Sequence, residues 1–299
     1  MEVISIGATE IDSIRRRLDC DFRGLLKHGV EVKINESSVG NLTFLSCDLQ
    51  GADEEGCMLV KDYVADALSD IILGDWKQVL LRKIIRTNYY YFNEKEQEHI
   101  LDCAARSLED GRMRGNNHKA LSSCKQIIRH KILDYLAASD KLIVEGFITF
   151  RLKEYMEELE DAVDRAVDEF LLEREYKEFI RLLKHFVEVQ EPTLDRVHVL
   201  MSNSGIFTLL DDHGRVLNRE YLEDFVIEVT DGEADYEDVL ISALVTIAPR
   251  KIVLHGPPDF RGSDAVVTVN NVFDGRVTFC QGCSLCRKAR QHRAQKKEY

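Results

Sequence analysis

The sequence predicts an α+β protein: a mainly helical body, a small N-terminal α+β unit and a C-terminal α/β subdomain that ends in a Cys-rich knuckle. Three observations support this class. All four prolines, Pro192, Pro249, Pro257 and Pro258, lie in the last third of the 299 residues, so no proline interrupts helices before that point. Apolar residues recur at helical spacing in the middle of the chain. Both ends of the chain instead carry short apolar runs, which are separated by residues typical of turns.

The N-terminal unit begins with a predicted strand at residues 3–6 and an amphipathic helix at about 9–27. Two further strands are predicted at 30–34 and 42–47, joined through the polar stretch 36–40. These elements are expected to form a small sheet with one helix.

The helical body opens with an apolar stripe that runs from Val60 to Ile84 at helical spacing. Asn93 then stands three residues before Glu96, a spacing that lets both side chains satisfy free backbone amides at a helix start. A new helix is therefore predicted to begin there. A further apolar stripe predicts a helix at about 119–137.

The longest helical signal covers residues 145–189, where apolar residues from Leu152 to Phe170 recur at alternating spacings of four and three. Between Glu154 and Glu175 the other side carries ten acidic residues against Arg165 and Arg174. This side is expected to face solvent or to dock a partner, because no histidine joins the carboxylates in a metal-binding pattern.

The C-terminal subdomain begins with a predicted hairpin of residues 197–201 and 206–210. Helix and strand then alternate at about 236–248, 251–255, 264–273 and 276–279. A strand, a helix and a second strand in succession imply adjacent parallel strands with a right-handed crossover. The cysteine cluster begins where the last strand ends.

The predicted domains are residues 1–56, 57–191 and 192–286, followed by a basic tail at 287–299. No apolar run approaches the ~18 residues that a bilayer span needs. The first residues also lack the charged and apolar regions of a signal peptide. We therefore expect a cytoplasmic chain without a membrane span.

Charge is distributed unevenly. The net charge of −13 argues against nucleic-acid binding over the whole surface, because phosphate contacts need Lys and Arg. The tail is basic, however, and Arg287, Lys288, Arg290 and Arg293 are its candidate anion-binding residues. Nucleic acid is expected to bind only through this tail, if at all, and another protein is the expected partner.

Three of the eight cysteines, Cys280, Cys283 and Cys286, form a Cys-x-x-Cys-x-x-Cys cluster. Two residues between successive cysteines let their thiolates converge on one metal ion or cluster. Gly282 supplies the backbone freedom that such a turn uses. In a reducing compartment such a cluster favours metal binding or redox chemistry over a disulfide.

Zinc takes four ligands, so a fourth must be found. His255 ends the preceding strand of the predicted parallel pair, which places it at the same carboxyl edge as Cys280. We predict it as the fourth ligand. His292 in the tail can also reach the cluster, whereas Cys47 or Cys57 requires the N-terminal unit to fold back.

The cysteine spacing favours zinc over an iron–sulfur cluster, because no Cys-Pro pair follows Cys286. Besides zinc and an iron–sulfur cluster, a third interpretation is that Cys280 and Cys283 bind no metal and form a redox-active thiol pair. In that case Arg287 and Lys288 would lower the pKa of a thiol. Thioredoxin-like pairs precede a helix within a βαβ unit, whereas this pair closes its domain. The redox reading therefore ranks below the two metal readings.

The aromatic run Tyr89–Phe92 can stack nucleic-acid bases, but the glutamates that follow it repel phosphate, so we expect it to pack in the fold. The sequence contains no glycine-rich phosphate loop, no Gly-x-Ser-x-Gly and no His-Glu-x-x-His. Ordinary hydrolase and nucleotide-enzyme functions therefore lack support, and a non-enzymatic role is favoured.

Five segments resemble the YtxC family: residues 89–94, 145–159, 182–192, 241–256 and 280–286. The resemblance spans roughly residues 61–286 and is clearest after Glu145. It implies an endospore-forming host and a sporulation context, but it brings no activity or catalytic residue.

These observations lead to one hypothesis and two alternatives. The chain is expected to be a sporulation-associated, metal-stabilised interaction protein. The first alternative is a thiol or iron–sulfur redox protein, and the second is a nucleic-acid-binding protein that uses the knuckle and the basic tail.

Overall fold

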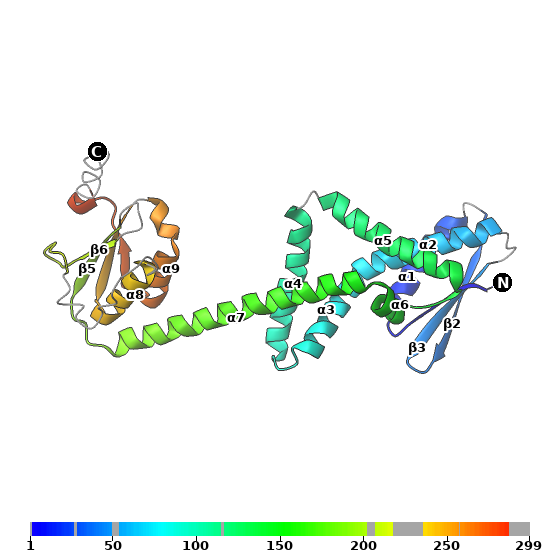
Figure 1. The fold of residues 1–299 in the computed structure, drawn as a ribbon, viewed down its shortest axis with the longest axis horizontal. Helices are drawn as coiled ribbons and strands as arrows, with labels where there is room; N and C mark the ends of the chain where they lie inside the picture. Colours follow the sequence, from blue (N-terminus) through cyan, green and yellow to red (C-terminus); the bar gives the residue numbers. More distant parts are fainter. Residues whose placement is uncertain are drawn as a thin grey trace. The chain divides into compact units, whose positions relative to one another are not determined.

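The computed structural model describes residues 2–26, 29–49, 54–114, 117–201, 207–217, 236–256 and 258–286. The chain forms two compact units, Met1–Leu171 and Leu172–Tyr299, and it passes from one to the other within helix α7, Lys153–Val189 (Figure 1). Each unit contains a four-stranded sheet, and long helices dominate the first unit. The predicted α+β class is confirmed.

The sheet of the first unit has the order β2-β3-β1-β4. Its strands are β1 (Glu2–Ala8), β2 (Val32–Val39), β3 (Leu42–Leu49) and β4 (Lys141–Ile143). β3 pairs antiparallel with β1 and β2, whereas β4 pairs parallel with β1. Helix α1, Asp12–Leu25, buries Ile14, Leu18 and Phe22 in the core of this unit.

The connection between β2 and β3 differs from the sequence prediction. Residues 36–39 continue β2 instead of forming a linker, because Gly40, with φ of +62°, makes the turn. Most side chains of β2 are exposed, so polar residues are tolerated there without a desolvation penalty. Their polarity is the reason why the sequence prediction made this strand too short. β4 was also not predicted, because three residues carry no periodicity.

In the described part of the first unit, α1 is followed by the helices α2 (Glu54–Leu73), α3 (Asp75–Asn88), α4 (Glu94–Arg114), α5 (Asn117–Ala138) and α6 (Val144–Arg151) and by the first half of α7. The predicted helix start at Asn93 is confirmed. Its side-chain oxygen accepts hydrogen bonds from the amides of Lys95 (3.0 Å) and Glu96 (3.1 Å), and the Glu96 carboxylate accepts from the Asn93 amide at 2.9 Å.

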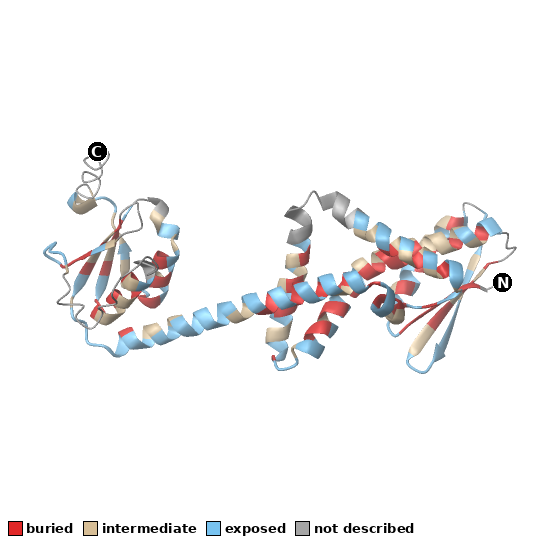
Figure 2. Cartoon of the chain, in the orientation of Figure 1, coloured by how far each residue is buried: buried red, intermediate tan, exposed pale blue. Residues whose placement is uncertain are grey.

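The single helix predicted over residues 145–189 is divided in the structure. Leu152, with φ −108° and ψ 42°, separates α6 from α7, and its side chain is buried in the core. The first half of α7 buries Leu159, Val163 and Ala166, as its apolar spacing predicts, while all ten acidic residues of the other side are exposed. In Figure 2 buried and exposed residues alternate along the first half of α7, whereas its second half is mostly exposed. None of the helices in the described ranges combines the length and the apolar character that a bilayer span requires.

The second unit has a sheet of order β6-β5-β7-β8, with β5 (Arg196–Met201), β6 (Phe207–Leu210), β7 (Lys251–His255) and β8 (Val277–Phe279). β6 pairs antiparallel with β5, while β5, β7 and β8 are parallel. The predicted parallel neighbours are confirmed. Helix α9 (Asp264–Val272) is the crossover between β7 and β8, and helix α8 (Tyr236–Ile247) precedes β7. The apolar side chains of both helices form the core with Val199, Ile252 and Leu254.

Candidate metal centre

Two neighbouring strand ends position the first two residues of the site. His255 is the last residue of β7, and Cys280 directly follows β8. The Cys280 backbone N–H donates to the carbonyl of Leu254 at 2.9 Å, which extends the strand pairing by one step. His255 and Cys280 therefore lie at the same carboxyl edge of the sheet.

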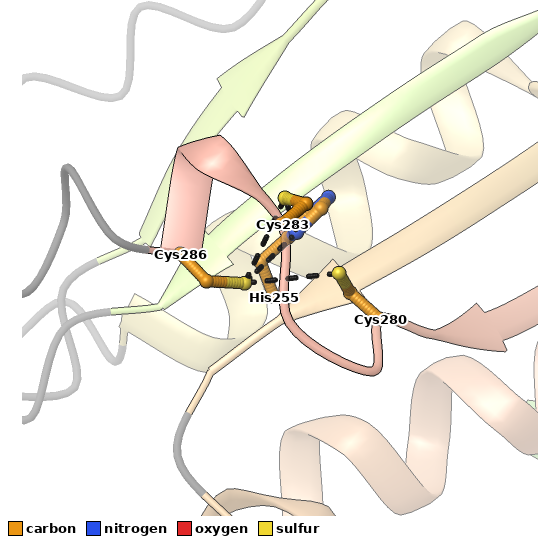
Figure 3. Close-up of side chains that lie close together, drawn as sticks. All are labelled: His255, Cys280, Cys283 and Cys286. Atoms are coloured by element: carbon orange, nitrogen blue, oxygen red, sulfur yellow. Dashed lines mark hydrogen bonds between the residues drawn. The ribbon is translucent and has the colours of Figure 1, made fainter.

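A tight turn then brings the other two cysteines back to this edge (Figure 3). Gly282 has φ of +121°, a conformation that side chains with a Cβ rarely adopt. Its N–H donates to the Cys280 sulfur at 3.4 Å, and a short helical turn at residues 284–286 follows. The turn thus depends on glycine at position 282.

The four ligand atoms of His255, Cys280, Cys283 and Cys286 all lie within 4.8 Å of one another. Cys286 Sγ is 3.9 Å from Cys283 Sγ and 3.7 Å from Cys280 Sγ. His255 Nδ1 is 3.4 Å from Cys286 Sγ and 3.5 Å from Cys283 Sγ.

These four separations match edges of a small tetrahedron, and the two remaining pairs of ligand atoms lie within 4.8 Å. Bonds of about 2.3 Å to sulfur and about 2.0 Å to nitrogen around one tetrahedral ion place the ligand atoms roughly 3.5 to 3.8 Å apart. Disulfide sulfurs lie about 2.05 Å apart, and all three cysteines are free thiols. The residues present therefore fit one metal ion.

The surroundings favour the forms that bind metal. His255 is 4% exposed, and burial lowers its pKa, as does the neighbouring His198, which favours the neutral imidazole. Burial opposes ionisation of the Cys283 thiol, but the backbone amides of Cys286 and Leu285 and the nearby thiols lower its pKa overall. Burial raises the pKa of Cys280, a shift that a bound cation would oppose.

His198 on β5 is a residue of this region that the sequence did not reveal. Its Nδ1 lies 2.9 Å from Nε2 of His255, and the two ring centroids are 5.1 Å apart. Burial lowers the pKa of His198, and the nearby Arg196 lowers it further. The available signal was one histidine in each of two predicted strands, 197–201 and 251–255, but the pairing and register of β5 against β7 were needed to use it.

The other ligand candidates are divided between the first unit and residues outside the described ranges. Cys47, buried in β3, and Cys57 on α2 belong to the first unit. His292 and the anion-binding candidates Arg287, Lys288, Arg290 and Arg293 lie outside the described residues.

The aromatic run before α4 packs in part against the rest of the first unit. Phe92 is buried and contacts Phe170 edge to face with ring centroids 5.4 Å apart. Tyr89 donates to the Asp164 carboxylate at 2.7 Å, whereas Tyr90 and Tyr91 are exposed. Half of the run therefore serves packing at the helix junction.

Comparison with known proteins identifies relatives without a described activity. A sequence profile of the YtxC-like family matches residues 62–278, which include His198 and His255 and end before Cys280. A protein of Bacillus subtilis (strain 168), named "Uncharacterized protein YtxC", is 27% identical over 202 residues, which cover 65% of this chain and 68% of the relative. No solved structure matches the chain.

Proposed function

This chain belongs to the YtxC-like family, and from that premise we propose that it is a metal-stabilised interaction protein. In this proposal one zinc ion is held by His255, Cys280, Cys283 and Cys286. The observation that supports it is the set of four ligand atoms within 4.8 Å of one another, with separations that suit a single tetrahedral ion.

The ligand set favours zinc over an iron–sulfur cluster. Thiolate and imidazole ligands in a tetrahedral arrangement are typical of zinc. In a [4Fe–4S] cluster each thiolate binds a different iron atom, so the sulfurs lie farther apart than sulfurs that share one ion. The short sulfur separations of 3.7 and 3.9 Å therefore support a single ion.

The number of protein ligands favours a structural role. Catalytic zinc sites keep one position open for water or substrate, whereas four protein ligands close the site. An ion held in this way would tie the ends of β7 and β8 to the turn after β8 and would stabilise the edge of the second unit. It would not supply a reactive water.

A protein partner is supported by α7. Five large apolar side chains in its second half are between 48% and 67% exposed in the described part of the chain: Leu172, Phe179, Leu182, Phe186 and Val189. They recur at spacings of three, four and seven, so they lie along one side of the helix. Exposed apolar side chains that gather in this way are typical of a surface that contacts another protein.

The cellular part of the proposal is a cytoplasmic role in sporulation. Its supports are the reduced thiols, which suit a reducing compartment, and the resemblance to a family associated with sporulation. Deletion of the gene in its host is expected to lower the yield of heat-resistant spores. Restoring the gene with both Leu182→Ser and Phe186→Ser is expected to leave the yield low; a parental yield in the deletion strain would refute this role.

The metal proposal is tested by elemental analysis and an absorption spectrum of the full chain purified without added metal. One zinc per chain and a colourless protein are expected. His255→Ala should lower zinc affinity by orders of magnitude, while His130→Ala, at an exposed position of the first unit, should not change it. Brown protein with inorganic sulfide would support the iron–sulfur redox alternative, and metal-free protein with a redox-active thiol pair would support the thiol alternative.

A further inference from the structure

We propose that His198 is a positioning residue of the metal centre. It accepts a hydrogen bond from Nε2–H of His255 and thereby holds the His255 ring with Nδ1 directed at the sulfurs. This inference rests on the proposed metal binding, because it concerns how that site is kept in its binding geometry.

The direction of the hydrogen bond follows from the chemistry of imidazole. Nδ1 of His255 lies 3.4 and 3.5 Å from two of the sulfurs, so it is the nitrogen that would bind the ion. A neutral imidazole that binds a metal through one nitrogen carries its proton on the other. Nε2 of His255 is therefore the donor, and Nδ1 of His198, 2.9 Å away, is the acceptor.

The strand register makes this contact a fixed feature of the sheet. His255 is paired with Leu200 across the parallel strands β7 and β5, and His198 lies two residues before Leu200. Side chains two residues apart in a strand share a face, so both histidines stand on the same side of the sheet. That side is opposite to Val199 and Leu254, which pack in the core with α8 and α9.

The distance also separates this role from direct metal binding. Two nitrogens that bind one tetrahedral ion lie roughly 3.3 Å apart, whereas the two histidine nitrogens are 2.9 Å apart, a hydrogen-bond distance. His198 is moreover absent from the group of four residues whose ligand atoms converge. It therefore acts through His255.

Loss of the acceptor would affect the site in two ways. The His255 side chain is almost fully buried, so an unpaired Nε2–H would be left without solvent. The ring would also be free to rotate about its Cβ–Cγ bond, which would move Nδ1 away from the sulfurs. Removing such a hydrogen-bond partner from a metal-binding histidine typically weakens metal binding by about 10- to 100-fold.

The test compares zinc affinities of full-length variants by competition with a chromophoric chelator. His198→Leu removes the acceptor, and His198→Asn restores one, because its side-chain oxygen can occupy the place of Nδ1. His213→Leu is the matched control, since His213 is an exposed residue of the same unit. If His198→Leu does not fold, His198→Ala compared with His198→Asn makes the same measurement.

His198→Leu is expected to bind one zinc about 10- to 100-fold more weakly than the wild type. His198→Asn should recover most of this loss, and His213→Leu should match the wild type. Equal affinity of His198→Leu and the wild type would overturn the positioning role while leaving the metal site intact. Equal weakness of the Asn and Leu variants would overturn it too, because space filling and not the acceptor would then matter. A wild-type chain that binds no zinc would instead refute the proposed function.

Discussion

The two units use cysteine in different ways. In the first unit Cys47 is fully buried in the core beside apolar neighbours, and Cys57, Cys103 and Cys124 line its margin. In the second unit three cysteines converge with a histidine at the edge of a sheet. The same residue type thus serves as a small apolar side chain in one unit and as a candidate ligand in the other, and the surrounding backbone makes the difference.

The two units also differ in how much a metal centre would add to their stability. The core of the first unit is continuous from β1 to the first half of α7. Among the described residues, the second unit has a smaller core, and its strand β8 has three residues before the Cys-rich turn. A bound ion would therefore contribute much to the stability of the second unit and little to that of the first.

Metal removal should produce the largest difference in stability between the two units. Chelation is expected to lower the free energy of unfolding of the second unit by about 4 kcal/mol, the linkage value when free metal exceeds its dissociation constant a thousandfold. Hydrogen exchange followed by mass spectrometry can measure the two units separately. Protection should fall in β7, β8 and α9 and stay unchanged in α2 and α3; an equal loss in both units would contradict the assignment.

Glycine-to-alanine substitutions should have opposite signs in the two units. Gly282 has φ of +121°, so Gly282→Ala should destabilise the metal-bound turn by about 1–3 kcal/mol and weaken zinc binding about tenfold or more. Gly24 lies within α1 with open space around its Cα, so Gly24→Ala should stabilise the first unit by about 0.4–1 kcal/mol. Chelator competition and urea unfolding measure the two effects.

Cys47→Ala is expected to destabilise the first unit by about 1 kcal/mol, because it leaves a small cavity in β3. Trp76, the single tryptophan, is buried in α3, so its fluorescence reports unfolding of this unit. Zinc content should stay at one per chain. A loss of zinc in this variant, in place of a loss of stability, would make Cys47 a ligand.

The smallest expected effect concerns pH and the contact between Tyr89 and Asp164. Burial, together with this hydrogen bond, raises the pKa of Tyr89 to about 12 from its ordinary value of 10. The folded state therefore holds the phenolic proton more tightly than the unfolded state, so this stabilisation is complete below pH 10 and lost as the pH rises through about 12.

Tyr89→Phe should consequently be less stable than the wild type at about pH 9 and closer to it at about pH 11.5, as measured by urea unfolding with Trp76 fluorescence. Tyr90→Phe, at an exposed neighbouring position, should match the wild type at both values. A difference between Tyr89→Phe and the wild type that does not change with pH would show that the phenolic proton has no part in it.

Much of the fold could be predicted from local patterns. The capping pair Asn93 and Glu96, the strand at Lys251–His255 and the parallel pairing of β7 with β8 all follow from short stretches of sequence. The break at Leu152 could not be predicted, because its side chain fits the apolar spacing of the helices on both sides. β4 likewise depends on pairing with β1, far away in the sequence.

The candidate site divides in the same way. The convergence of Cys280, Cys283 and Cys286 follows from their spacing, and the approach of His255 follows from one predicted crossover. The contact of His198 with His255 could not be predicted, because it depends on the register of β5 against β7, which only the packed sheet fixes.

X-ray absorption spectroscopy at the zinc edge of the purified full chain is the most direct test of the metal centre. Three sulfur ligands at about 2.3 Å and one nitrogen ligand at about 2.0 Å are expected in the first shell. A first shell of oxygen and nitrogen alone would contradict a thiolate site. A first shell of four sulfurs would contradict the role of His255, since the other cysteines of the chain would then supply the fourth ligand.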